Sequence, residues 1–408
     1  MNFFLCLGII MLGGGVLGYV LKLIKLPSLI GYLALGIVMG YFGLMNEQIA
    51  ALSSELRKIA LVIILLKAGL SLNLKDLKKV GRPAILLSIL PCCLEMATVG
   101  IVAHYLLGLS FIESFILGSV LGAVSPAVVV PRMAKMLDEK QGTKEGVPQM
   151  VIAGAALDDI VMIVFFTSFM TIEGGGSITP MTILNVPISI VSGIAVGIGL
   201  GFLLSFIFKH LHMRDSLKLI LTLGVIFGLV FLETFLAKWF SYSSLLSAIT
   251  IGIVLLLRRK EQATRMAAKC EKIWQIAEIF LFVLVGASIQ IKYALNVFGL
   301  AVAVIFIGLV VRFLAAYLAT IKTGLSFKER SFVSISYLPK ATVQAAIGGG
   351  LLDLGNELGK QPIIDAGIVV LSVAVVSILL TAPLGAILMD LTYKKLTKKE
   401  DNACVCEK

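Results

Sequence analysis

The chain alternates between long apolar segments and short polar connections, and this pattern predicts its fold. Taking about 20 apolar residues as the length of one membrane-spanning helix, we identify thirteen such segments. Their approximate limits are 2–21, 28–44, 58–74, 83–107, 111–137, 147–172, 181–208, 216–236, 242–257, 273–291, 296–321, 331–354 and 362–389. The pattern therefore predicts an all-α polytopic membrane protein with about 13 transmembrane helices.

Basic residues are sorted between alternate connections. When each connection is numbered by the segment it follows, the odd connections and the C-terminal tail hold most of the 35 Lys and Arg residues. Positively charged connections tend to stay on the cytoplasmic side of a membrane. The sorting therefore predicts an N-terminus outside and a C-terminus in the cytoplasm, and we expect the membrane to be a bacterial inner membrane.

The predicted sides of the connections also relate two blocks of six segments, the first six and the last six. The first block starts outside and the second starts inside, so the two blocks can be repeats only if they are inverted. Many secondary transporters are built from inverted repeats that carry broken helices at matching places. We therefore predict a first repeat over 1–172, a linker helix over 173–215, a second repeat over 216–393 and a short cytoplasmic tail over 394–408.

Prolines interrupt the fifth segment of each block. Ser125 and Pro126 lie near the middle of one segment, and Pro339 and Lys340 lie at a comparable depth in the other. A proline removes a backbone donor and clashes with the preceding turn, so we expect both helices to open there. The opening frees backbone groups around Val124 from helical hydrogen bonds. The two interruptions predict a pair of crossed, unwound helices.

Two adjacent carboxylates, Asp158 and Asp159, lie near the middle of the segment 147–172. A charge at the bilayer centre costs about 3 kcal/mol on insertion scales, so a pair of acids there indicates a function. Neighbouring helix positions lie about 100° apart, so the two acids should face different partners. Small hard cations prefer oxygen ligands. We predict that Asp158, Asp159, the Ser125 hydroxyl and freed backbone carbonyls around Val124 bind a small cation, and that a proton competes with it.

Three further charges, Glu95, Arg312 and Lys340, lie near the middle of apolar segments. We expect Lys340, with Thr342 close by, to offset the negative ends of half-helices at the crossing, and a proton-linked role for Lys340 is the alternative. An unpaired arginine in hydrocarbon is costly, so Arg312 should pair with Glu95 or with Asp158. Arginine stays protonated, so Arg312 should not carry the transported proton.

Composition narrows the class of partner. The chain is 59% hydrophobic and 14% charged, with a mean hydropathy of +1.02, whereas about a quarter of the residues of a soluble domain are charged. The formal charge of +11 is explained by basic residues sorted across a bilayer, so we expect lipid and small ions as partners and no nucleic acid. The six cysteines show no metal-ligand spacing. We expect neither a cofactor nor an enzymatic activity.

The motifs around these residues resemble those of the monovalent cation/proton antiporters, and they are most similar to the NHA-type Na⁺/H⁺ antiporters. Four stretches carry a resemblance that runs along most of the chain: ILLKAGLSLNLKDLKK, AHYLLGLSFIESFILGSVLGAVSPAVVVP, AALDDI and LPKATVQAAIGG. The resemblance implies exchange of Na⁺ or Li⁺ for H⁺ by alternating access. It also implies a homodimer in which a core domain with crossed, unwound helices moves against a dimer domain.

The resemblance also implies roles for individual residues. By position, Asp159 matches the essential ion-binding carboxylate and Asp158 its partner, while Ser125 matches a site residue of the first unwound helix. Lys340 matches the basic residue of the second unwound helix. Better-known bacterial antiporters with two aspartates place a lysine where this chain has Arg312, so their two-proton stoichiometry is not implied here.

Other readings of the same residues stay open. A K⁺/H⁺ antiporter or a K⁺ efflux protein of the same fold is the main alternative, although such efflux systems usually carry a soluble nucleotide-binding domain after the membrane part. An intramembrane aspartyl protease takes its two acids from separate helices, whereas here they are consecutive on one helix. A sensor or a channel fits the topology but has no need of two broken helices.

Overall fold

The computed structural model describes residues 1–71, 81–175, 180–211, 213–236 and 242–399, and residues 400–408 of the predicted tail lie outside this part. The helices are α1 (Phe3–Leu23), α2 (Leu29–Tyr41), α3 (Glu47–Ala51), α4 (Ser53–Ser71), α6 (Arg82–Leu107), α7 (Phe111–Leu121), α8 (Pro126–Asp138), α9 (Val147–Gly174), α10 (Pro180–His210), α11 (Asp215–Leu236), α12 (Ser244–Arg258), α13 (Lys260–Ala287), α14 (Ile291–Ala319), α15 (Phe327–Ser336), α16 (Thr342–Ile347), α17 (Gly350–Leu358) and α18 (Gln361–Leu396). Each of the thirteen predicted segments overlaps at least one of these helices.

The described residues confirm the predicted all-helical membrane fold. Eight of their helices are long and apolar enough to cross a membrane when α7 and α8 are taken as one span, and α2 and α12 are shorter apolar helices. The number of thirteen spans and the relation of the two blocks as inverted repeats stay predictions.

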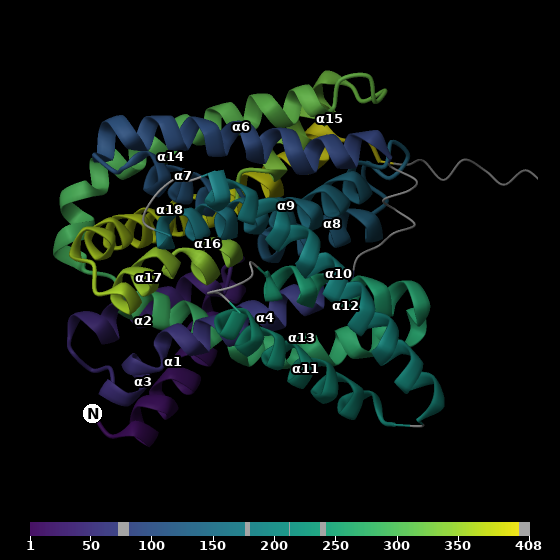
Figure 1. Ribbon diagram of the computed structural model, residues 1–408. Helices are drawn as coiled ribbons and strands as arrows, with labels where there is room; N and C mark the ends of the chain where they lie inside the picture. Colours follow the sequence, from purple (N-terminus) through teal and green to yellow (C-terminus); the bar gives the residue numbers. More distant parts are fainter. Residues whose placement is uncertain (72–80, 176–179, 212, 237–241, 400–408) are drawn as a thin grey trace, which may run out of the picture.

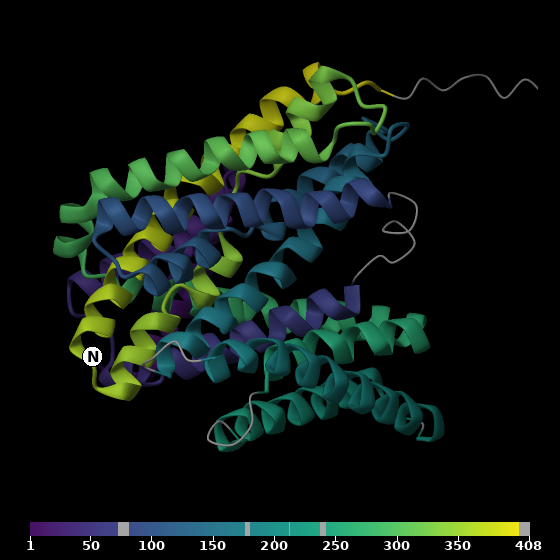
Figure 2. The same cartoon turned by 45° about the horizontal axis from the view of Figure 1, so that its top comes forward.

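The helices form two bundles, which we name by their position in the fold. The core bundle contains α6–α9 and α14–α18, and the scaffold bundle contains α1–α4 and α10–α13. Figures 1 and 2 show α6 and α14 side by side along the upper edge of the molecule, with α10–α13 at the opposite side. Each bundle thus contains helices from both predicted repeats, and the two acids on α9 belong to the core bundle.

The two interrupted helices begin with the same local signal. Ser110 and Glu113 form a capping box at the start of α7, and Ser326 and Glu329 form one at the start of α15. In both cases the next half-helix begins sixteen residues after the capping serine, α8 at Pro126 and α16 at Thr342. A proline at the first helical position suits a restarting helix, because its missing N–H has no partner to lose there.

A close helix contact brings α6 against the first broken helix. A Cβ atom at Gly118 of α7 would lie 2.4 Å from the carbonyl oxygen of Met96 on α6. Small residues at such contacts let helix backbones approach one another in a membrane. The contact holds α6, and Glu95 next to Met96, beside the interruption of α7.

Candidate cation-binding site

The interruptions of the two broken helices meet directly. The N–H of Ser125, between α7 and α8, donates to the carbonyl oxygen of Pro339, between α15 and α16, at 2.8 Å. Across the same crossing, the side-chain amide of Gln344 on α16 donates to the carbonyl oxygens of Val120 at 3.0 Å and Ala123 at 2.9 Å. These bonds satisfy carbonyl groups that the end of α7 leaves without helical partners.

Arg312 on α14 is the central cation of the site. Its side chain is fully buried and lies 2.7 Å from Glu95 Oε2 and 2.6 Å from Asp158 Oδ2. It therefore contacts both of the partners that the sequence left as alternatives. Its guanidinium also donates to the carbonyl oxygens of Gly122 and Tyr337, which directly follow α7 and α15. One planar group thus binds two carboxylates and the negative ends of two half-helices.

Lys340 contacts a carboxylate rather than helix ends. Its Nζ lies 2.6 Å from Glu95 Oε2, and its backbone N–H donates to the Thr381 hydroxyl of α18 at 2.9 Å. The carbonyl ends that we expected Lys340 to offset are bound by Arg312 instead. The reason is reach, because the fork of five N–H donors on Arg312 spans several acceptors while an ammonium group is a point charge.

The two aspartates have different surroundings. Asp158 Oδ2 accepts from Arg312 and, at 2.7 Å, from the N–H of Val124, so this oxygen is held by the first interruption. Asp159 makes no hydrogen bond or ion pair to the described residues, and 8% of its surface is exposed. As expected from their helical positions, the two acids face different neighbours.

Asp159 faces a cavity of about 820 Å³ between the two bundles. Helix α9 contributes Asp159 to its wall, and Pro126 of α8 and Thr342 of α16 add the starts of the two second half-helices. The scaffold bundle supplies the opposite wall from α1, α2, α4 and α13. The cavity therefore gives water and small ions a route to Asp159.

Buried oxygen atoms without a protein partner gather among the predicted site residues. They are Ser125 Oγ, Asp158 Oδ1, Asp159 Oδ1 and Thr342 Oγ1. A buried oxygen without a hydrogen bond is costly, and Tyr337 Oη and Gln344 Oε1 at the same crossing also lack a partner among the described residues, so this part of the structure indicates a ligand. Carboxylate and hydroxyl oxygens are the donors that a small hard cation prefers, and this set fits Na⁺ as the transported substrate.

The buried charges of the site do not balance. Arg312 and Lys340 offset Glu95 and Asp158, which they contact. Asp159 has no such cation among the described residues. An ionised site therefore carries one net negative charge, and either one monovalent cation or one proton neutralises it.

Sequence reasoning missed Gln344 and Glu278. Gln344 is fully buried two residues after Thr342, and its position directly after the second interruption was a usable signal. Glu278 lines the cavity from α13 and was visible as a carboxylate inside the apolar segment 273–291.

We expect Gln344→Leu to destabilise the protein by about 2–3 kcal/mol, because buried carbonyl groups of Val120 and Ala123 lose their donor. The measurement is thermal unfolding in detergent. Gln361→Leu is the matched control, since Gln361 makes its hydrogen bond to Asp365 at an exposed position. Equal melting temperatures for the two variants would show that Gln344 does not hold the crossing together.

Comparisons with known proteins agree with this geometry. A family model described as "Sodium/hydrogen exchanger, transmembrane" matches residues 8–391. The human protein named sodium/hydrogen exchanger 9B2 is 37% identical over 410 residues, which cover 96% of this chain and 74% of the relative. Human sodium/hydrogen exchanger 9B1 is 31% identical over 414 residues, which cover 94% of this chain and 76% of the relative.

The fold also matches a solved structure. The sodium proton antiporter MjNhaP1 of Methanocaldococcus jannaschii superposes with a TM-score of 0.82, over 97% of this chain and 99% of that chain. The two sequences are 20% identical. This likeness concerns the fold, and the family match and the curated relatives concern the sequence.

Proposed function

Since the chain belongs to the sodium/hydrogen exchanger family, we propose that it exchanges Na⁺ for H⁺ across a membrane by alternating access. The observation that carries the proposal is Asp159, a carboxylate that has no side-chain partner among the described residues and faces a cavity beside two interrupted helices. Asp158, Ser125 and Thr342 each add an oxygen without a partner. Li⁺ has the same charge and a similar preference for oxygen ligands, so we include it as a substrate.

The charge balance of the site gives the coupling. With Asp159 ionised and no cation bound, the core bundle would carry a net charge past the apolar barrier, which is costly. A single Na⁺ or a single proton removes this charge. The site therefore crosses when occupied by either ion and resists crossing when empty, which couples one Na⁺ to one proton.

The sides of the membrane follow from the predicted orientation. Lys22, Gln149 and Glu271 line the cavity and lie at segment ends next to connections that we predict to be cytoplasmic. On the other side, Arg57 of α4 lies 2.6 Å from Asp353 of α17 and ties the scaffold bundle to the core bundle. This arrangement supports an inward-facing state with a closed outer side.

We expect Arg57→Ala to shift the protein toward the outward-facing state. Arg57 is buried, so its loss leaves Asp353 without its ion pair and also removes a hydrogen bond to Ser288, which directly follows α13. The measurement is labelling of a cysteine placed at Thr342 by a membrane-impermeant thiol reagent added from outside. Unchanged labelling would show that this ion pair does not hold the outer side closed. Lys58→Ala, which removes only exposed ion pairs at the same helix end, is the control.

The proposed function is tested with purified protein in liposomes that contain a pH-sensitive dye. A pH gradient is imposed, and Na⁺, Li⁺ or K⁺ is added outside, with and without a clamp on the membrane voltage. The proposal predicts dye responses to Na⁺ and Li⁺ that the clamp does not change. A response to K⁺ alone would favour the potassium alternative, which the names of the family and of the relatives do not support.

We also propose the setting in which this exchange takes place. The protein is integral to a membrane, as its apolar helices and its family indicate. We place it as a homodimer in a bacterial inner membrane, with its N-terminus outside and its C-terminus in the cytoplasm, on the basis of the sorted basic residues and the resemblance to antiporters.

A further inference from the structure

Glu278 on α13 is an acid for which the exchange mechanism so far has no use. It lies inside the apolar segment 273–291, is half-buried, and lines the cavity that leads to Asp159. Among the described residues it makes no hydrogen bond and no ion pair, because Lys67 binds Glu271 instead. An unpaired carboxylate inside a membrane segment is costly, so its presence there indicates a function.

Glu278 belongs to a polar stripe along α13. Glu271, Gln275 and Glu278 are spaced by four and three residues, which places them on one face of the helix, and all three line the cavity. Glu271 and Glu278 are seven positions apart, which is about 10 Å along the helix axis. The stripe therefore runs inward from the cavity mouth, where Lys67 pairs with Glu271, to Glu278, which has no ion pair among the described residues.

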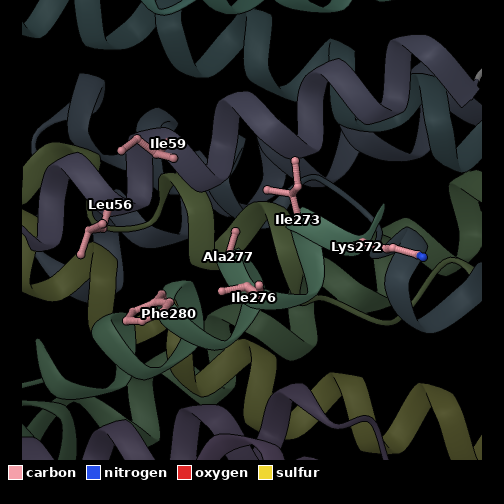
Figure 3. A pocket seen from close by; sticks show the side chains of 7 residues that line it. All are labelled: Leu56, Ile59, Lys272, Ile273, Ile276, Ala277 and Phe280. Atoms are coloured by element: carbon pink, nitrogen blue, oxygen red, sulfur yellow. The ribbon is translucent and has the colours of Figure 1, made fainter. Parts of the chain in front are cut away.

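The opposite face of α13 is apolar. Figure 3 shows Ile273, Ile276, Ala277 and Phe280 beside Leu56 and Ile59 of α4, in a groove separate from the cavity. Lys272 is the one charged residue of this groove, at its end. Within residues 271–280 of α13, both acids therefore lie on the side that faces the cavity, and the other side is lined by apolar residues.

We propose that Glu278 is a second cation-binding group, which holds Na⁺ in the cavity before the ion reaches Asp159. The two acids lie on different bundles and share the cavity, and neither has an ion pair among the described residues. Asp159 is more than nine-tenths buried and has an oxygen without a partner, so the inner end of the cavity already accepts a cation. Tyr32 and Gln275, whose side chains carry neutral oxygens, also line the cavity.

Other charged and titratable groups shape this intermediate site. Lys22 of α1 and Lys67 of α4 line the cavity as cations, and Tyr19 lies beside Lys22. Since Lys67 is engaged by Glu271, Glu278 has no fixed cation of its own among the described residues. A mobile cation is then the group that balances it.

The location of Glu278 makes the inference specific to one face of the membrane. Glu278 is part of the scaffold bundle, whereas Asp159 moves with the core bundle when the cavity closes under alternating access. Glu278 should therefore assist Na⁺ that arrives through the cavity and have no part in binding from the other face. This statement rests on the proposed exchange function and adds a residue to it.

The test is the KM for Na⁺ on each face, measured in everted and in right-side-out membrane vesicles that contain the full-length protein. We expect Glu278→Gln to raise the KM about tenfold on one face only, with kcat within about twofold, the effect of one lost nearby charge. Glu278→Asp keeps the charge and should stay within about threefold of the unmodified KM. Glu261→Gln removes an acid from the exposed start of the same helix and is the control.

The possible outcomes distinguish the role of Glu278 from the proposed exchange function on which it rests. An unchanged KM on both faces, or an equal rise on both, would overturn the role of Glu278 while leaving exchange intact. Absence of Na⁺-driven exchange from the unmodified protein would instead contradict the proposed function. If Glu278→Gln does not reach the membrane, Glu278→Ala provides the uncharged variant, since it removes no ion pair.

Discussion

Asp159→Asn is expected to abolish Na⁺/H⁺ exchange, lowering the rate at least about 100-fold, while the protein stays folded. The variant keeps the shape of the side chain but removes the charge in the site that no cation among the described residues offsets. It then binds Na⁺ poorly and carries no exchangeable proton. The measurement is the dye response in liposomes, together with the melting temperature in detergent.

Asp158→Asn is the matched control on the neighbouring residue. Asp158 is bound to Arg312 and to the N–H of Val124, so its loss should lower the melting temperature as well as the exchange rate. The comparison thus separates a carboxylate that serves the ion from one that also holds the structure. Exchange by Asp159→Asn at more than about a tenth of the unmodified rate would rule out Asp159 as the coupling group.

Arg312→Ala is expected to destabilise the protein by about 3–5 kcal/mol, the usual cost of removing one partner of a buried ion pair. The change leaves Asp158 without its cation and removes the donor to the carbonyl groups of Gly122 and Tyr337. For a chain of 408 residues the expected fall in melting temperature is about 4–6 °C. Thermal unfolding in detergent measures it directly.

Arg265→Ala provides the comparison for this stability effect. Arg265 pairs with Asp215 at 2.7 Å, but 53% of its side chain is exposed, so its loss should cost at most about 1 kcal/mol. Arg312→Lys keeps the charge but loses the planar fork, and it should fall between the two. Melting of Arg312→Ala at the temperature of the unmodified protein would contradict the central place of Arg312 in the site.

Much of the fold was predictable because a bilayer imposes simple rules. Apolar length predicted where helices lie, and proline positions predicted the interruptions near Ser125 and Pro339, because a missing N–H acts locally. The pairing of Arg312 with Glu95 or Asp158 was also predictable in kind, since a buried arginine needs an acid. The structure shows that Arg312 contacts both acids at once.

The arrangement of helices in two bundles could not be predicted in the same way. The arrangement depends on which helices that are far apart in the sequence pack against one another, and hydropathy carries no information on these contacts. The partner of Lys340 was missed for a similar reason, since the approach of α6 that brings Glu95 within 2.6 Å is a tertiary contact. Glu278 became meaningful only when the structure placed it in the same cavity as Asp159.

The central claim is that Na⁺ and H⁺ compete for one charge, and the most direct measurement is proton release on Na⁺ binding. Purified protein in weakly buffered detergent solution is mixed with Na⁺, and the released protons are counted with a pH indicator. The account predicts release of up to one proton per chain, with an apparent Na⁺ affinity that weakens as the pH falls, and no release from Asp159→Asn. Na⁺ binding without proton release at every pH tested, or equal release from Asp159→Asn, would contradict it.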